Sequence, residues 1–97
     1  MYARAVTVSV NPEKLDDMLE IMRESVLPAA KSQQGFKGAL VLGDRETGDE
    51  VSITFWDSET EMIAGGRSGY YQEQVAKFGA ILTGQPVRKH YEVFLHV

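Results

Sequence analysis

The sequence lacks cysteine altogether and contains only one tryptophan and three prolines. Without cysteine the chain has no disulfide bonds, no thiolate metal ligands and no thiol nucleophile. The same absence fits a reducing compartment, so we expect a cytoplasmic protein. Long apolar runs are missing as well. No segment is long enough to span a bilayer, and the N-terminal MYARAVTVSV lacks the apolar core of a signal peptide.

Basic residues are also scarce: ten Lys and Arg stand against fourteen Asp and Glu, and the formal net charge is −4. An acidic chain without a basic cluster is not expected to bind nucleic acid or an anionic membrane surface. The length of 97 residues predicts a single domain over residues 1–97. A domain of this size buries a modest share of its surface, so a partner subunit would add burial that the chain alone lacks.

The first half of the chain predicts a strand, a helix and a second strand. Tyr2–Val10 alternates in polarity and size, which is typical of a strand. Asn11 followed by Pro12 is a typical helix start. The helix carries one apolar stripe, formed by Leu15, Met18, Leu19, Met22 and Val26. Pro28 lacks an amide hydrogen, so we expect a kink or break near residues 24–27.

A β-hairpin is predicted next, because the apolar segments Phe36–Leu42 and Glu50–Asp57 flank a polar, glycine-containing loop. The loop and its edge carry four acids, Asp44, Glu46, Asp49 and Glu50. Their spacing does not match the twelve-residue loop that binds calcium, so we expect no calcium site.

A second helix begins after Ser58, which forms an S-x-x-E capping box with Glu61. We expect this helix to be interrupted at Gly65-Gly66 and to restart at Ser68. The last strand is predicted over Val87–Val97, where side chains alternate between two faces.

The predicted order βαββαβ indicates an α+β fold: the ferredoxin-like plait, a four-stranded antiparallel sheet with both helices on one side. Val51, Ile53 and Phe55 lie on the opposite side of their strand from Trp56. The sheet face without helices therefore carries apolar bulk that needs a cover. We expect that cover to be a second copy of the chain, giving a homodimer through sheet-face packing.

Particular residues support a family resemblance. Gly35-Phe36 opens the second strand, and the run F-W-D-S-E-T-E follows the hairpin with a W-x-S-x-x-x-M pattern at Trp56, Ser58 and Met62. In these features, and in the layout of the whole chain, the sequence resembles the antibiotic-biosynthesis monooxygenase family. The resemblance implies a dimeric α+β barrel with a pocket between the sheet and the helices of each subunit.

The resemblance also implies two chemistries. Some members oxidise aromatic quinols with molecular oxygen and no metal or flavin; these carry Asn where Ser52 stands and Tyr where Met62 stands, so Trp56 is the one match. Others degrade haem, using an Asn near the position of Arg4 and an axial His near Gly66, and neither is present here. We therefore expect a monooxygenase without cofactor or metal that acts on a small, electron-rich, quinol-type aromatic. The alternative is a non-catalytic homodimer that binds a small ligand, or a stress-related protein of the same fold.

Trp56 is the first candidate catalytic residue, since its indole can stack on a flat substrate and donate one hydrogen bond. The alternative interpretation is a core tryptophan that fastens the strand beneath the second helix. Ser52 and Thr54 share its face and are small and hydroxylic, which is typical of a pocket lining and predicts that they bind substrate.

His90 is the second catalytic candidate, as a base that deprotonates a phenol. Glu92 and His96 share its predicted face, so Glu92 is positioned to orient the imidazole or raise its pKa. Two histidines and one carboxylate are too few ligands to predict a metal site. The alternative interpretation is an exposed polar face on an edge strand.

Arg4 and Tyr71 complete the predicted substrate-binding set. Arg4 is suited to hold an anionic or phenolate group, or else to pair with Glu92. Adjacent tyrosines on a helix point about 100° apart, and the stripe formed with Val75 and Phe78 selects Tyr71 for the interior.

Overall fold

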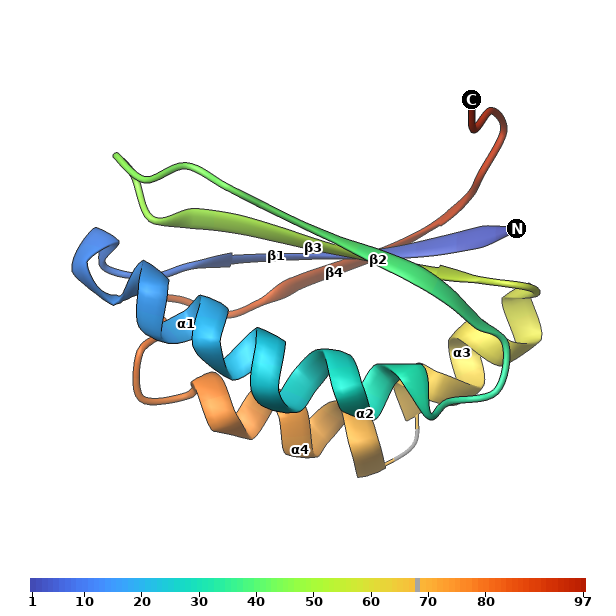
Figure 1. Cartoon of the computed structure of the whole chain (residues 1–97), viewed down its shortest axis with the longest axis horizontal. Coiled ribbons are helices and arrows are strands. Elements are labelled where there is room, and N and C mark those ends of the chain that lie inside the picture. The colour runs from blue at the N-terminus through green and yellow to red at the C-terminus, as the bar shows by residue number, and fades with distance from the viewer. Residues whose placement is uncertain (68) are drawn as a thin grey trace.

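The computed structural model describes residues 1–67 and 69–97, together with the side chains of all of these except residues 69–71, 74 and 75. Four strands form one antiparallel sheet in the order β2-β3-β1-β4. They are β1 (Tyr2–Ser9), β2 (Phe36–Gly43), β3 (Asp49–Trp56) and β4 (Val87–Glu92). Figure 1 shows the helices together on one side of this sheet. The α+β, ferredoxin-like fold predicted from the sequence is confirmed.

The first helical stretch runs through four consecutive segments, as Figure 1 shows in blue to green. They are η1 (Pro12–Lys14), α1 (Leu15–Ile21), the π-helical η2 (Met22–Val26) and α2 (Leu27–Lys31). The Asn11 side chain caps the start by accepting a hydrogen bond from the Glu13 amide at 3.0 Å. Pro28 cannot donate to the preceding turn, and the wider π turn lies directly before it. The irregularity thus falls where Pro28 predicts it, although the helix widens there and does not end.

The second helical stretch consists of α3 (Glu59–Arg67) and α4 (Gly69–Phe78). Ser58 caps α3. Its Oγ accepts a hydrogen bond from the Glu61 amide at 3.2 Å and donates one to the Glu61 carboxylate at 3.0 Å. The predicted interruption at Gly65-Gly66 is wrong, because α3 continues through both glycines to Arg67. Their role is close packing, since a β-carbon at Gly65 would lie 2.9 Å from Trp56 Cη2. Ser68, the predicted restart, lies outside the described residues.

The last strand is shorter than predicted. β4 ends at Glu92, which is opposite Tyr2 at the beginning of β1, so the neighbouring strand offers no further register partners. One more backbone bond follows, from the Val93 amide to the Met1 carbonyl at 2.9 Å. Residues 94–97 then leave the sheet on the side away from the helices (Figure 1). The prediction of a strand to Val97 is wrong for this reason.

The core lies between the sheet and the first helical stretch. Its buried members are Val8, Val10, Leu15, Met18, Met22 and Phe78. They come from β1, from Val10 just after it, and from the apolar stripe of the helix, joined by Phe78 at the end of α4. Within the described part of the chain, no helix has the length and apolar character needed to cross a bilayer.

Candidate functional site

A cavity of about 80 Å³ lies between the helices and the sheet, beside this core. The walls are mainly apolar and come from α1, η2, α2, α4 and the sheet. They include Val6, Val8, Met18, Met22, Leu27, Ala39, Val41, Phe78 and Leu82. A single water needs about 10–15 Å³, so the cavity is several waters in size. It occupies the place where the family resemblance implies a pocket.

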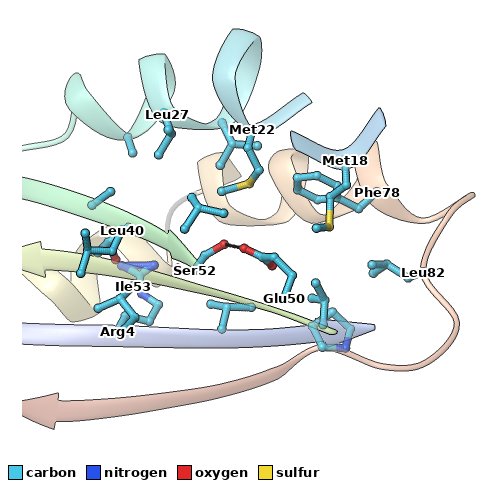
Figure 2. A pocket seen from close by; sticks show the side chains of 18 residues that line it. Arg4, Met18, Met22, Leu27, Leu40, Glu50, Ser52, Ile53, Phe78 and Leu82 are labelled. Atoms are coloured by element: carbon cyan, nitrogen blue, oxygen red, sulfur yellow. Dashed lines mark hydrogen bonds between the residues drawn. The ribbon is translucent and has the colours of Figure 1, made fainter. Parts of the chain in front are cut away.

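The floor of the cavity carries a row of polar side chains, which Figure 2 shows rising from the strands. Glu50, Ser52 and Thr54 are alternate residues of β3 and therefore share its helix-facing side. Arg4 is opposite Thr54 in the β1–β3 register. An acid thus lies at one end of the row and a guanidinium at the other, and the backbone positions of Glu50 and Thr54 are about 13 Å apart along the strand at about 3.3 Å per residue.

Glu50 is the most unusual member of the row, because only 2% of its surface is exposed. Burial raises the pKa of the Glu50 carboxyl from 4.5 to about 7, and the hydrogen bond donated by Ser52 Oγ opposes that rise in part. At neutral pH the group is therefore poised between its acid and carboxylate forms. Carboxyl groups with such pKa values are concentrated in functional sites.

Glu50 was not among the site residues predicted from the sequence, where it was grouped with the acids of the hairpin loop. A usable signal was nevertheless present. Glu50 is in phase with Ser52, Thr54 and Trp56, so the period of two that places those residues on the helix-facing side places Glu50 there as well.

Arg4 lines the opposite end of the cavity and is only 3% exposed. Its Nη2 donates to the Met62 carbonyl oxygen at 3.0 Å, and its Cζ lies 5.1 Å from the centroid of the Trp56 ring. The second contact is a cation–π interaction. In the register between β1 and β4 the residue opposite Arg4 is His90, whereas Glu92 is opposite Tyr2.

Trp56 is completely buried and is not among the described residues that line the cavity. Its ring packs edge-on against Phe36 with centroids 5.8 Å apart, and Gly65 of α3 closes over it. Its indole Nε1 donates to Thr54 Oγ1 at 2.9 Å. Trp56 thus lies behind the cavity wall, where it holds Thr54 and Arg4 in place. The catalytic role predicted for Trp56 stays a prediction, and in this arrangement it would act through those two residues.

His90 lies on β4, the exposed edge strand, outside the described lining of the cavity. Partial burial lowers the pKa of His90, the positive charges of Arg4 and Arg88 lower it further, and Glu59 opposes them. Glu92, which was expected to raise the pKa of His90, is not among the described groups that shift it. His90 is therefore held in its neutral form. It is in register with Arg4 and so faces the same side of the sheet as Thr54, but it is not among the described residues that line the cavity, and its catalytic role stays a prediction.

His96 was expected to continue the face of His90, and that expectation is wrong. The His96 ring stacks on Phe55 with centroids 6.1 Å apart and planes at 29°. Phe55 lies on the sheet face without helices, and His96 reaches it because the chain leaves the sheet after β4 and turns to that side. Among the described residues no three His, Asp or Glu side chains converge as metal ligands.

Of the predicted substrate-binding residues, the structure brings Arg4, Ser52 and Thr54 together on the cavity floor. The Tyr71 backbone belongs to α4, but its side chain lies outside the described residues, so its place in the lining stays a prediction.

Solved structures of the same fold are numerous. A monooxygenase from the gene ActVA-Orf6 of Streptomyces coelicolor, in complex with the ligand nanaomycin D, superposes with a TM-score of 0.83 at 18% identity, over 99% of this chain and 89% of that one. A structure named antibiotic biosynthesis monooxygenase gives 0.77 at 14% identity, over 98% and 100% of the two chains. A Nitrosomonas europaea protein of unknown function, NE2512, gives 0.80 at 16% identity, over 99% and 91%. The chain therefore has the fold of the antibiotic biosynthesis monooxygenases.

The relatives found by sequence have no named activity. No family model matches the chain. The uncharacterized protein Rv2557 of Mycobacterium tuberculosis is 26% identical over 96% of this chain. A second uncharacterized protein of that organism, Rv2558, is 30% identical over 66% of this chain and is matched over 27% of its own length. The chain spans about two fifths (41%) of the length of Rv2557.

Proposed function

We propose that the protein is a cofactor-independent monooxygenase that acts on a small, electron-rich aromatic substrate of the phenol or quinol type. The observation that carries the proposal is the cavity itself: an apolar chamber whose floor holds a buried acid, two hydroxyls and a buried guanidinium in one row. Apolar pockets with a few convergent polar groups are typical small-molecule sites. Structures of the same fold that are named monooxygenases support the same class of reaction.

The chemistry needs no group beyond substrate and oxygen. A base removes the phenolic proton, and the electron-rich ring carbon opposite the oxygen forms a bond to molecular oxygen. The O–O bond then breaks: one oxygen atom stays on the ring as a quinone carbonyl, and the other leaves as water with the protons released from the ring and the hydroxyl. The phenol supplies all four electrons that reduce the oxygen molecule. The protein would contribute orientation, exclusion of bulk water and a proton acceptor.

Arg4 and Thr54 are suited to the oxygen atoms of the substrate at their end of the cavity. Arg4 is held rigidly by Met62 and Trp56, and a positive charge that cannot be lost stabilises a phenolate or peroxide oxygen as negative charge develops there. Thr54 accepts the Trp56 hydrogen bond, so its own hydroxyl proton can be donated into the cavity.

Oxygen uptake and product analysis test the proposal. Single-ring phenols with hydrogen on the carbon opposite the hydroxyl are incubated with the protein under isotopically labelled oxygen, and the quinone product is examined for one labelled atom. The cavity-filling variant Ala39→Leu is expected to lower kcat/KM about 100-fold by displacing the ring. The same substitution at the exposed Ala64, Ala64→Leu, is the matched control and is expected to leave the rate unchanged. Equal rates in both variants would move the reaction away from this cavity.

A second copy of the chain is part of the proposal. On the sheet face without helices Leu40, Leu42, Val87 and Tyr91 are each about half exposed. A contiguous apolar sheet face is typical of an interface, and the absence of helices there leaves it open for face-to-face packing of two sheets. The homodimer and the location in the cytoplasm both remain predictions.

The competing function is a non-catalytic homodimer that binds a small ligand. The placement of Trp56 behind the wall favours it, because a fully packed indole is out of direct reach of a ligand. Tight binding of phenols without any oxygen uptake would support that alternative.

A further inference from the structure

We propose that Glu50, supported by Ser52, is the group that receives the hydroxyl of a single-ring phenolic ligand and takes its proton, with the ring held between Met18, Met22 and Phe78. This inference rests on the proposed function for its catalytic step, but its binding step stands without it.

The first support is the position of the carboxyl group. Glu50 lines the cavity, is almost wholly buried, and its carboxyl lies beside Ser52 under the helices (Figure 2). In the described part of the chain, Ser52 Oγ is the one side chain that donates a hydrogen bond to it. A carboxyl group has two oxygens and about four lone-pair sites, so it retains the capacity for a further hydrogen bond. Burying an acid with so little compensation costs stability, and such a cost is common at functional sites.

The second support is the lining above the carboxyl. Met18 and Met22 are buried on the helix, and Phe78 meets them from α4. Thioether sulfur makes favourable contacts with aromatic rings, and methionine side chains rotate easily to change the shape of a cavity. An engineered cavity of about 150 Å³ admits benzene. At about 80 Å³ this cavity is smaller, so it fits at most one ring and only after Met18 or Met22 has reoriented.

The third support is the charge around the carboxyl. Val8 and Gly43 are opposite Glu50 in the register of the neighbouring strands, and the described lining from η2 and α4 is apolar. The charged side chains among the described lining residues are Arg4, at the far end, and Arg45, in an adjoining pocket between α1 and the end of β2. Arg45 is exposed and pairs with Asp16 of α1 at 3.1 Å. Burial therefore dominates, and the proton affinity of Glu50 rises about 300-fold, from a pKa of 4.5 to about 7.

A raised proton affinity suits the proposed step. When the phenolic O–H bond breaks, the electron pair stays on the phenolate oxygen and the proton goes to the ionised Glu50 carboxylate, giving the neutral acid. An ordinary phenol has a pKa of about 10, so a carboxylate of normal acidity is a poor acceptor for its proton. Burial narrows the difference between the pKa of the carboxyl group and that of the phenol, and the carboxylate still remains ionised above neutral pH.

The binding step is tested without oxygen, with phenol and toluene as probes of nearly equal size. Calorimetric titration under argon at pH 8 is expected to show that the wild type prefers phenol by about tenfold to a hundredfold, the worth of a hydrogen bond to a charged group. The preference is expected to shrink as the pH falls through about 7, where Glu50 becomes protonated. In Glu50→Gln it is expected to be a few-fold and independent of pH. Equal affinity of the wild type for phenol and toluene at pH 8 would overturn the inference.

The catalytic step is tested by oxygen uptake. Glu50→Gln is expected to lose about 100-fold or more in kcat/KM together with the rise of the rate through pH 7, and Glu50→Asp is expected to recover part of both. Glu46→Gln, the same change at an exposed acid of the hairpin loop, is the matched control. A Glu50→Gln variant that folds and keeps wild-type kcat/KM would overturn the role of Glu50 and leave the monooxygenase proposal standing. Absence of uptake by the wild type, with the pH-dependent preference for phenol intact, would overturn the monooxygenase and leave Glu50 as the ligand's acceptor.

Discussion

Each face of the sheet carries residues whose polarity is unusual for its surroundings. The face covered by helices buries Arg4 and Glu50, which are 3% and 2% exposed. The face without helices displays Leu42 and Tyr91, which are 51% and 52% exposed. Buried charged groups and exposed apolar side chains are both costly for an isolated domain, so each needs a reason. We propose a different reason for each: a ligand site on the covered face and a partner subunit on the open face.

The largest expected effect is on the open face. Leu42→Asp is expected to convert a dimer into a monomer at micromolar concentration, because two-fold symmetry buries two unpaired carboxylates in the interface and each costs several kcal/mol. Sedimentation equilibrium measures the result. Lys31→Asp, on the exposed surface of α2, is the control and is expected to leave the mass unchanged. A wild-type protein that is already monomeric would contradict the proposed partner subunit on the open face.

The next effect is the pH dependence that Glu50 gives to stability. Between pH 4.5 and about 7 the folded protein holds a proton on Glu50 that the unfolded chain has released. The free energy of unfolding is therefore expected to fall by about 3 kcal/mol as the pH rises through that window, and then to level off.

Urea unfolding of the wild type and of Glu50→Gln at several pH values checks this dependence. The variant is expected to lack the fall, while Glu46→Gln keeps it. If Glu50→Gln showed the same fall as the wild type, the pH dependence would belong to other groups.

A smaller effect is expected at the wall of the cavity. Trp56→Phe removes the hydrogen bond to Thr54 and part of a fully buried ring, so it is expected to lower the free energy of unfolding by about 2 kcal/mol. Thr54→Val removes the hydrogen bond and keeps the indole, and thermal unfolding of the two variants separates the contributions. A loss of phenol binding in Trp56→Phe greater than in Thr54→Val would place the ring itself in the site.

The smallest effect belongs to neither face. Ser58→Ala removes the cap of α3, the helix that closes over Trp56, and is expected to cost about 1 kcal/mol. Thermal unfolding measures it, and phenol binding is expected to be unchanged. A variant as stable as the wild type would show that the packing of Gly65 on Trp56 fixes α3 without its cap.

The fold was predictable because its signals are local and agree with one another. Four local signals lead to the same order of elements: the alternation in β1 and β3, the cap at Asn11, the capping box at Ser58 and the position of Pro28. The Gly65-Gly66 error has a physical cause: glycine in a sequence does not distinguish a flexible break from a close approach. Only the Trp56 ring, which is distant in the sequence, decides between the two.

The site was predictable in part for similar reasons. The period of two placed Ser52 and Thr54 on one side of their strand, and both line the cavity floor together with Arg4. Burial, in contrast, depends on the helices above the strand, so the sequence could not show that Trp56 lies behind the wall while Glu50 lies in front of it. The end of β4 likewise depends on where its neighbour β1 begins. For that reason His90 and His96 were wrongly predicted to lie on the same face.

The π-helical turn at Met22–Val26 has a consequence for the rate at which a ligand enters. This turn supplies Met22 and Val26 to the cavity wall and interrupts the regular hydrogen bonding of the first helical layer. We therefore expect the amide hydrogens of this turn to exchange with solvent sooner than those of α1, and to be protected first when phenol is bound. Ligand association would then be limited by the opening of one helical turn, and would be slower than diffusion to an open groove allows.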